Sequence, residues 1–166
     1  HRQLGSLQVL QSGSIATGIG NVLGNKGGVA VGLLLGRGTR LLLINSHFAA
    51  HDDKVADRNA DYTRIAAELF GARSGGGDVC SEYDVTVWCG DFNYRVNSNR
   101  RAADMLIERK MWEVMRANDQ LTQERVKGRT FKGFEEGDLT FAPTFKFDPG
   151  TDTYDTSQKM RVPSWT

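Results

Sequence analysis

The pattern of apolar and polar positions near the start of the chain predicts three strands. Residues 7–16 form a weak strand pattern. Two apolar runs follow at 29–35 and 40–45, separated by a Gly-Arg-Gly-Thr turn, and this spacing predicts an antiparallel hairpin. Neither run alternates cleanly between apolar and polar residues, so we expect both faces of this sheet to be covered.

A helical stripe follows the hairpin. We expect a helix over residues 52–70, capped by Asp52 or Asp53, because carboxylates near a helix N-terminus suit the helix dipole. Apolar side chains at helical spacing form one face of this helix: Val55, Tyr62, Ile65, Ala66 and Leu69. A short buried strand is predicted at 85–89, where β-forming residues follow one another.

The second half of the chain predicts two more helices and then extended chain. One helix begins at one of the polar residues 97–99 and runs to about residue 110, and a shorter one spans 113–123. Extended segments follow at 130–134 and 139–147. Strands that alternate with helices, together with the hairpin, predict an α/β or α+β fold with a mixed sheet and helices on its outer faces.

The composition is that of a globular protein. The 166 residues carry 21 Lys plus Arg and 20 Asp plus Glu, a net charge of +1. This balance excludes a strongly cationic sheath for nucleic acid as the main feature. The longest apolar run, residues 29–35, is too short to span a bilayer. Two cysteines, Cys80 and Cys89, form no disulfide framework, so we expect a reducing, cytoplasmic compartment.

A glycine-rich segment at 17–28 is the first candidate for binding chemistry. Leu23 stands where a dinucleotide-binding fingerprint needs its third glycine, and Asn25 interrupts the Walker pattern before Lys26. What remains is a flexible backbone that can bring amide groups and the Lys26 ammonium close to an anion. A tight turn between two strands explains the same residues equally well.

Two of the three histidines follow the predicted hairpin. His47 and His51 are four residues apart, and in a helix both would share one face, as zinc ligands do. The glutamate of a His-Glu-x-x-His motif is absent, and a purely structural role is the alternative. The clustering of the two histidines favours a functional role.

Asp91 and Asn93 directly follow the predicted strand at 85–89. In extended backbone, residues i and i+2 point to the same side, so this carboxylate and this amide can orient and activate a water molecule or hold a metal-bound one. The position at a strand end favours such a role, because open α/β sheets bind ligands there. The alternative is an Asx-turn in which both side chains bond local backbone.

Cationic and aromatic residues gather near the C-terminus. Lys146 lies between Phe145 and Phe147, and Lys159 and Arg161 follow. Cations beside rigid aromatic rings suit a polyanion that carries several phosphates. An edge strand with solvated charges is the alternative. A nucleic-acid groove would show a similar mixture, so this pattern alone does not separate these functions.

Taken together, these segments resemble the inositol polyphosphate 5-phosphatase family of the endonuclease/exonuclease/phosphatase superfamily. The resemblance rests on six segments in the family's order: GNKGGV at 24–29, NSHFAAH at 45–51, RNADY at 58–62, WCGDFNYR at 88–95, LTFAPTFKFD at 139–148 and KMRVPSWT at 159–166. It implies a deoxyribonuclease-like fold, a four-layer sandwich of mixed β-sheets flanked by helices. It also implies Mg²⁺-dependent hydrolysis of the 5-phosphate of phosphoinositides or inositol polyphosphates.

The resemblance assigns roles in the chemical step to three residues. His47 would contact the scissile phosphate and stabilise the developing charge. Asp91 would position or deprotonate the attacking water, and Asn93 would hold this water in line. These roles agree with the physics of phosphate-ester hydrolysis, which needs mainly positioning and neutralisation of spread negative charge.

The glycine loop and the second histidine are assigned to substrate binding. Asn25 and Lys26 match the family segment that meets the 1-phosphate side of a lipid substrate. His51 resembles a further active-site residue near the phosphate. The resemblance therefore places the segments at 24–29 and 45–51 around one ligand.

The C-terminal cations are assigned to the neighbouring phosphate. Lys146 and Lys159 match the lysines that bind the 4-phosphate, and Arg161 would help line the same pocket. Phe145 stands where many members of the family have tyrosine. A hydroxyl contact would then be missing, which predicts a weaker hold on the 4-phosphate.

The resemblance also predicts that residues 1–166 are a partial catalytic domain, incomplete at both ends. In the family a metal-binding glutamate lies upstream of the glycine loop, and Asp-Arg and Asp-His pairs follow the Pro-Ser-Trp segment. The sequence begins at His1 and stops at Thr166, before those pairs would occur. We therefore expect no metal ligand of the site within the chain, no activity of the isolated chain, and poor folding where apolar sheet faces lack a partner.

Two other functions stay open. A nuclease on the same scaffold would use the same catalytic residues but has no need for lysines at 146 and 159. A non-catalytic module that binds phosphoinositide headgroups would need no complete catalytic centre. We expect a phosphoinositide or inositol phosphate partner and no nucleic acid, a role in signalling, and peripheral contact with membrane surfaces through the headgroup.

Overall fold

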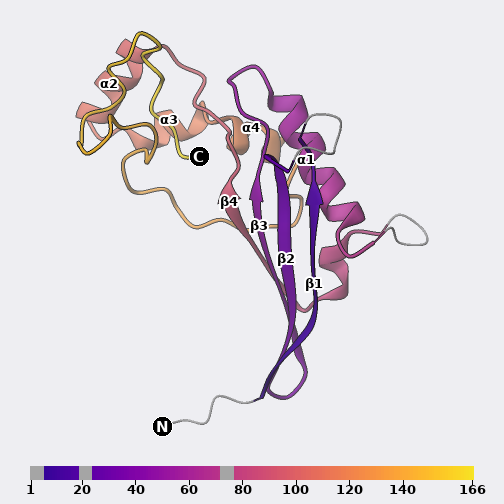
Figure 1. Cartoon of the computed structure of the whole chain (residues 1–166). Coiled ribbons are helices and arrows are strands. Elements are labelled where there is room, and N and C mark those ends of the chain that lie inside the picture. The colour runs from indigo at the N-terminus through magenta and orange to yellow at the C-terminus, as the bar shows by residue number, and fades with distance from the viewer. Residues whose placement is uncertain (1–5, 19–23, 72–76) are drawn as a thin grey trace. The chain divides into compact units, whose positions relative to one another are not determined.

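Figure 1 shows the computed structural model of the chain, which describes residues 6–18, 24–71 and 77–166. These residues belong to two compact units, His1–Phe92 and Asn93–Thr166. Each unit has its own buried side chains and is described separately. Leu23, which decided against a dinucleotide-binding fingerprint, lies outside the described residues.

The described residues of the first unit form a four-stranded mixed sheet in the order β1-β2-β3-β4. Its strands are β1 (Leu7–Ala16), β2 (Gly27–Leu35), β3 (Thr39–His47) and β4 (Val85–Asp91). β2 and β3 form the predicted antiparallel hairpin, and β1 is antiparallel to β2. β4 is parallel to β3, so the chain must cross over between them. The predicted mixed sheet is confirmed.

Helix α1 (Val55–Glu68) lies in this crossover and covers one face of the sheet. Its predicted apolar stripe is confirmed, because Tyr62, Ile65 and Leu69 are all buried. The Ile65 side chain lies so close to β2 that a Cβ at Gly28 would come within 3.0 Å of it. A short 3-10 helix, η2 (Val79–Glu82), then leads into β4.

The predicted caps of α1, Asp52 and Asp53, are wrong. The helix begins after Lys54, which makes no capping hydrogen bond through its side chain. The Lys54 N–H donates to the carbonyl of His51 at 3.3 Å, and this turn delays the start of the helix to Val55.

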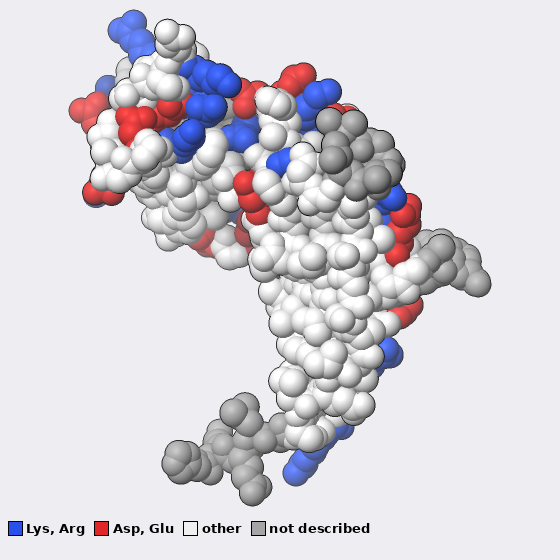
Figure 2. Space-filling model, in the orientation of Figure 1, with Lys and Arg blue, Asp and Glu red and all other residues white. Residues whose placement is uncertain are grey.

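Among the described residues of the first unit, the opposite face of the sheet is exposed. The register places apolar side chains in two rows across β2, β3 and β4, Val31–Leu43–Val87 and Leu33–Leu41–Val85. Val85 and Val87 are each 47% exposed. Figure 2 shows almost no Lys, Arg, Asp or Glu on the visible surface over these strands. Within the described residues of the first unit, α1 packs against only one face, so the expectation that both faces are covered is not met there.

Over residues 93–166, the second unit contains three short α-helices, α2 (Arg100–Glu108), α3 (Trp112–Ala117) and α4 (Gln120–Val126). α2 begins where the sequence predicts, because the Asn99 side chain accepts the Ala102 N–H at 2.9 Å. The core consists of Val96, Ala103 and Met115, with Leu106, Ile107, Trp112, Val162 and Trp165 packed against it. None of the helices in the described residues is long and apolar enough to cross a membrane.

The helix expected over 113–123 is divided into α3 and α4. Asp119 caps a new helix, because its Oδ2 accepts the Thr122 N–H at 2.8 Å. The Gln120 N–H donates to the carbonyl of Arg95 at 2.8 Å instead of continuing α3.

The extended segments expected after α4 are largely irregular. The segment 130–134 is a turn, because the Phe134 N–H donates to the carbonyl of Phe131. Within 139–147, extended pairing is confined to two isolated bridges, Phe145 with Ser164 and Phe147 with Tyr154. Both bridges join this segment to chain that follows it in the sequence.

Asp119→Asn tests the buried cap of α4. Burial raises the pKa of Asp119 from 3.8 to about 6. As the pH rises from 4 to 7.5, Asp119 loses its proton at a lower pH in the unfolded chain than in the native state. The free energy of unfolding therefore falls over this interval. Asparagine keeps the capping oxygen without the charge, so the stability gained by Asp119→Asn should be larger at pH 7.5 than at pH 4 by about 2 kcal/mol.

Urea unfolding followed by circular dichroism at the two pH values measures this difference. Asp138→Asn, at a carboxylate that is 82% exposed, is the matched control and should show no such pH dependence. An Asp119→Asn variant with the same stability gain at both pH values would contradict the cost of burying this charge.

Candidate active site

Three polar side chains meet at the ends of β2, β3 and β4. The register pairs Gly27 with His47 and His47 with Asp91, and Lys26 immediately precedes β2. Lys26 Nζ lies 2.5 Å from His47 Nε2, and Asp91 Oδ2 lies 3.5 Å from the same nitrogen. Lys26, His47 and Asp91, all predicted from the sequence, therefore form one group, which we call the edge cluster.

His47 Nε2 lies between a cation and an anion. This nitrogen can accept a hydrogen bond from the Lys26 ammonium when it carries no proton, or donate to Asp91 when it does. The side chains of His47 and Asp91 are 51% and 49% exposed, so a ligand can reach both. The edge cluster can thus bind an oxyanion through Lys26 and transfer a proton at His47.

A cavity of about 450 Å³ opens beside the edge cluster. Its lining includes Asn25, Lys26, Asn45 and His47, together with the end of β1. The structure therefore brings the glycine-loop residues Asn25 and Lys26 to the same cavity as His47. Their assigned contacts with substrate stay predictions.

Close packing of β4 against β3 brings the edge cluster together. Gly90 has φ 136°, and a Cβ there would lie 2.0 Å from the carbonyl oxygen of Ser46. The Trp88 indole N–H donates to Ser46 Oγ at 2.9 Å on the covered face of the sheet. Only glycine lets β4 pass this near β3, and this approach sets Asp91 next to His47.

A buried arginine holds the segment that follows β3. Arg58 of α1 is fully buried. Its guanidinium donates to the carbonyls of Ala49 at 3.1 Å, His51 at 2.6 Å and Asp52 at 3.3 Å. Asp61 accepts the Ala49 N–H at 2.8 Å, and burial raises the pKa of Asp61 while this bond opposes the shift. The two residues fix the path of the chain between β3 and α1.

His51 does not share a helical face with His47. β3 ends at His47, the segment 48–54 is not helical, and φ at His51 is 77°. The comparison with zinc ligands is therefore wrong, because it required a helix. The His51 side chain is exposed, and its role near a phosphate stays a prediction.

In the second unit, Arg95 links Asn93 to the aromatic segment. Asn93 is buried, its Oδ1 accepts from Arg95 Nη2 at 2.6 Å, and the Arg95 guanidinium lies 4.5 Å from the centre of the Phe145 ring. The backbone at Asn93 has φ 57°. The argument that extended backbone points Asp91 and Asn93 to one side is therefore wrong, and the role of Asn93 in holding water stays a prediction.

Two of the three cationic residues predicted in the second unit, Lys146 and Arg161, contact Asp155. The carbonyl of Lys146 accepts the Asp155 N–H at 2.9 Å, and Arg161 Nη1 lies 3.0 Å from Asp155 Oδ2. Lys159 lies between these two points in the chain and is exposed. The structure thus joins Lys146, Lys159 and Arg161 through one folded segment, while their contacts with phosphate stay predictions.

The sequence profile of the endonuclease/exonuclease/phosphatase family 2 matches residues 1–166. The chain belongs to this family. Within it, synaptojanin-1 of Homo sapiens is 42% identical over 153 residues, which cover 92% of the chain and 10% of that protein. The type II inositol 1,4,5-trisphosphate 5-phosphatase of Mus musculus is 36% identical over 160 residues, 94% of the chain and 16% of that protein. The chain therefore spans only a small part of the length of these relatives.

Two solved structures resemble the structure of this chain. The inositol polyphosphate 5-phosphatase domain of SPsynaptojanin, in complex with inositol (1,4)-bisphosphate and calcium ion, matches with a TM-score of 0.80 and 34% identity over 98% of the chain and 45% of that structure. A Cimex nitrophorin in its ferrous NO complex matches with a TM-score of 0.66 and 26% identity over 97% of the chain and 50% of that structure. The predicted fold class is confirmed. Because a phosphatase domain and a nitrophorin share this fold, function must be argued from the site.

The described parts of the chain contain no group of three or more His, Cys, Asp or Glu side chains that could hold a metal ion. Asp91 offers one accessible carboxylate, whereas a hard divalent cation needs several oxygen ligands.

Sequence reasoning missed the buried charges that support the site. Arg58 and Asp61 lie on the same helical stripe as Ile65, at positions where charged side chains need buried partners. Their position on the apolar stripe could have predicted that both side chains are buried and paired. Arg95 and Asp155 gave no comparable signal, because their partners lie in irregular chain.

Arg58→Lys tests the anchor behind β3. A lysine ammonium cannot span three carbonyls with a planar fork, so buried acceptors lose their donors. We expect the free energy of unfolding to fall by about 2–4 kcal/mol, measured by urea unfolding. Arg64→Lys, on the same helix but paired with Glu68, is the control and should change stability by less than about 1 kcal/mol. Equal effects of the two substitutions would contradict the anchoring role.

Proposed function

We propose that the natural full-length protein hydrolyses the 5-phosphate of phosphoinositides or inositol polyphosphates by in-line attack of water, assisted by Mg²⁺. The observation that carries this proposal is the edge cluster, in which Lys26 and Asp91 both meet His47 Nε2 beside a cavity. A cation, a proton-transfer group and a carboxylate at one accessible point are the groups that phosphate-ester hydrolysis uses. The names of the relatives support the same reaction.

Each residue of the edge cluster has a distinct task in this proposal. Because Lys26 contacts His47, we place it on the scissile phosphoryl group instead of the 1-phosphate that the resemblance implies, and an incoming phosphate oxygen displaces its contact with His47. His47 donates a hydrogen bond from Nε2 to a phosphoryl or leaving oxygen. Asp91 accepts a proton from the attacking water or orients it.

Mg²⁺ remains our expectation for the cation. When bound, a hard divalent cation neutralises charge on the phosphoryl oxygens. Because the described residues offer no complete set of ligands, we propose that further ligands come from outside them. The matched structure was solved with calcium ion, which supports a site for a divalent cation.

We propose that the second unit binds the inositol ring of the same substrate. Lys146 and Lys159 supply positive charge, and Phe145 presents a ring face held beneath Arg95. A lipid substrate would require peripheral contact with a membrane, and we propose a cytoplasmic location for the protein. The inositol bisphosphate named in the matched complex supports recognition of a phosphorylated inositol ring.

His47→Ala and Asp91→Asn test the proposed chemistry. Each should lower kcat for phosphate release from phosphatidylinositol 4,5-bisphosphate by about 10²–10⁴-fold, because proton transfer or water activation is lost. Glu108→Gln, at an exposed position on α2, is the control and should leave kcat unchanged. A parallel assay on duplex DNA separates a nuclease from a phosphatase. Release of phosphate by both variants at the wild-type rate would rule out the edge cluster as the catalytic centre.

Phe145→Tyr tests the predicted hold on the 4-phosphate. A tyrosine hydroxyl adds a hydrogen-bond donor. The ratio of kcat/KM for a 4,5-bisphosphorylated substrate to kcat/KM for a substrate without the 4-phosphate should therefore be about three- to tenfold higher in the variant than in the wild type. Phe147→Tyr, on a ring stacked against Tyr154 at 4.5 Å, is the matched control. The same ratio of kcat/KM values in wild type and Phe145→Tyr would contradict the assignment of Phe145 to this phosphate.

A further inference from the structure

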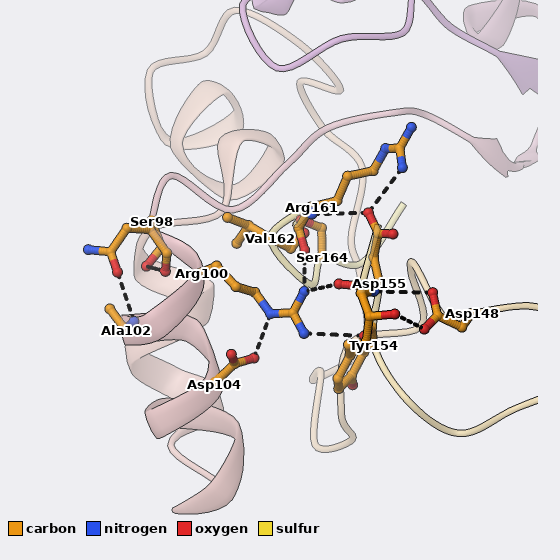
Figure 3. A network of polar contacts seen from close by, with 12 residues as sticks. Ser98, Arg100, Ala102, Asp104, Asp148, Tyr154, Asp155, Arg161, Val162 and Ser164 are labelled. Atoms are coloured by element: carbon orange, nitrogen blue, oxygen red, sulfur yellow. Dashed lines mark hydrogen bonds and ion pairs between the residues drawn. The ribbon is translucent and has the colours of Figure 1, made fainter. Parts of the chain in front are cut away.

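Figure 3 shows Asp155 in a network of polar contacts that includes Arg100 and Arg161. Asp155 is 2% exposed. Its Oδ1 accepts the Ser157 N–H at 3.1 Å, and its Oδ2 accepts both the Arg161 N–H at 3.1 Å and Arg161 Nη1 at 3.0 Å. One side chain therefore closes the loop 155–161, and Lys159 lies within that loop.

The backbone of Asp155 ties this loop to Lys146. The Asp155 N–H donates to the carbonyl of Lys146 at 2.9 Å. Next to this bond, the rings of Phe147 and Tyr154 stack at 4.5 Å, and Asp148 Oδ2 accepts from Thr156 Oγ1 at 2.6 Å. The backbone at Lys146 and the loop that carries Lys159 are thus fixed relative to each other at the same residue.

Arg100 anchors this arrangement to α2. Its guanidinium donates to the carbonyls of Asp155 at 2.5 Å, Arg161 at 3.3 Å and Tyr154 at 3.3 Å. The Arg100 side chain is 16% exposed and also pairs with Asp104 Oδ1 at 2.8 Å. The loop is therefore held to a helix by a fork of hydrogen bonds and not by apolar packing alone.

Within this network, the carboxylate of Asp155 accepts hydrogen bonds from Ser157 and Arg161. Hydrogen bonds from Ser157 and from the Arg161 N–H hold the pKa of Asp155 well below its ordinary value, so the carboxylate is ionised at neutral pH. Because Arg161 is the ion-pair partner of this carboxylate, its charge is compensated locally. The other two cations of the segment 146–161 are Lys146 and Lys159.

We propose that Asp155, Arg161 and Arg100 form a clamp that fixes the spacing of Lys146 and Lys159 and thereby sets selectivity for a phosphate next to the scissile one. In this role Asp155 and Arg100 are positioning residues, and Arg161 acts on the loop and not on the phosphate. The inference rests on the proposed function. Loss of the clamp should weaken binding of a substrate that carries the 4-phosphate and should leave the chemical step unchanged.

Steady-state kinetics of Asp155→Asn, Arg161→Gln and the double variant test the clamp in the natural full-length protein. Each single variant should raise KM for phosphatidylinositol 4,5-bisphosphate about tenfold, change kcat by less than about threefold, and leave KM for phosphatidylinositol 5-phosphate unchanged. The double variant should resemble the single ones, because both residues serve one interaction. Asp104→Asn, which removes the carboxylate that pairs with Arg100, is the matched control and should match the wild type.

A direct contact between Arg161 and phosphate predicts a different result. Asp155→Asn would then free Arg161 from its ion pair and leave KM unchanged or lower it. Arg161→Gln would raise KM both in the wild type and in the Asp155→Asn variant. Either that pattern or a loss confined to kcat would overturn the clamp.

Amide hydrogen exchange gives a readout that does not depend on activity. Asp155→Asn should increase exchange at Ser157 and Arg161 about tenfold or more without changing α2, and Asp104→Asn should change neither. If α2 also loses protection, Asp155→Asn has unfolded, and Arg161→Gln, which keeps the backbone bonds of Asp155, decides the question. Unchanged exchange at Ser157 would overturn the clamp.

Failure of the proposed function is distinguishable from failure of the clamp. A wild-type protein that releases no phosphate from any 5-phosphorylated inositol would refute the function alone. Calorimetric titration with inositol 1,4-bisphosphate against inositol 1-phosphate would then test the clamp, which predicts that Asp155→Asn weakens only the bisphosphate. Equal weakening of both ligands would count against it.

Discussion

The parallel register of β3 and β4 brings His47 and Asp91 together at one end of the sheet. Residue 47 pairs with residue 91 in that register, and a shift by one position would turn one of the two side chains to the opposite face of the sheet. Gly90 allows the two strands to approach, since any side chain there would collide with the carbonyl of Ser46. The meeting of an imidazole and a carboxylate at an accessible strand end thus follows from backbone packing on the covered face.

In each unit, a guanidinium group holds a loop in place. Arg58 binds three carbonyls behind β3, and Arg100 binds three carbonyls of the segment 154–161. In both places a guanidinium replaces the regular hydrogen bonds that irregular chain lacks. This lets exposed functional side chains lie on loops while their backbone stays fixed. The exposed apolar face of the sheet has no comparable support within the described residues.

Local patterns predicted the regular elements, and tertiary contacts decided where they end. The hairpin at 29–45 and the stripe of α1 follow from spacing, and the sheet and helix confirm them. The division of the helix expected over 113–123 could not be predicted from spacing, because it depends on the Gln120 N–H reaching the carbonyl of Arg95. The open sheet face was also missed, because apolar runs show which side chains need cover and not whether cover is present.

For the site, the sequence identified the chemical groups better than their geometry. Lys26, His47 and Asp91 were all predicted, and they meet in one cluster. The reasons given for His51 and Asn93 were wrong, because both adopt positive φ where helical or extended backbone was assumed. Side-chain contacts such as Arg95 over Phe145 depend on the three-dimensional path of irregular chain, and residue spacing carries no information about them.

The proposed hydrolysis requires that a 5-phosphoryl group engage the edge cluster. A crystal structure of the natural full-length protein with a non-hydrolysable 4,5-bisphosphorylated inositol analogue tests this most directly. We predict a 5-phosphoryl oxygen at about 3 Å from His47 Nε2, with Lys146 and Lys159 on the 4-phosphate. An analogue bound away from His47 and Asp91, or cationic side chains facing a separate surface, would contradict the account.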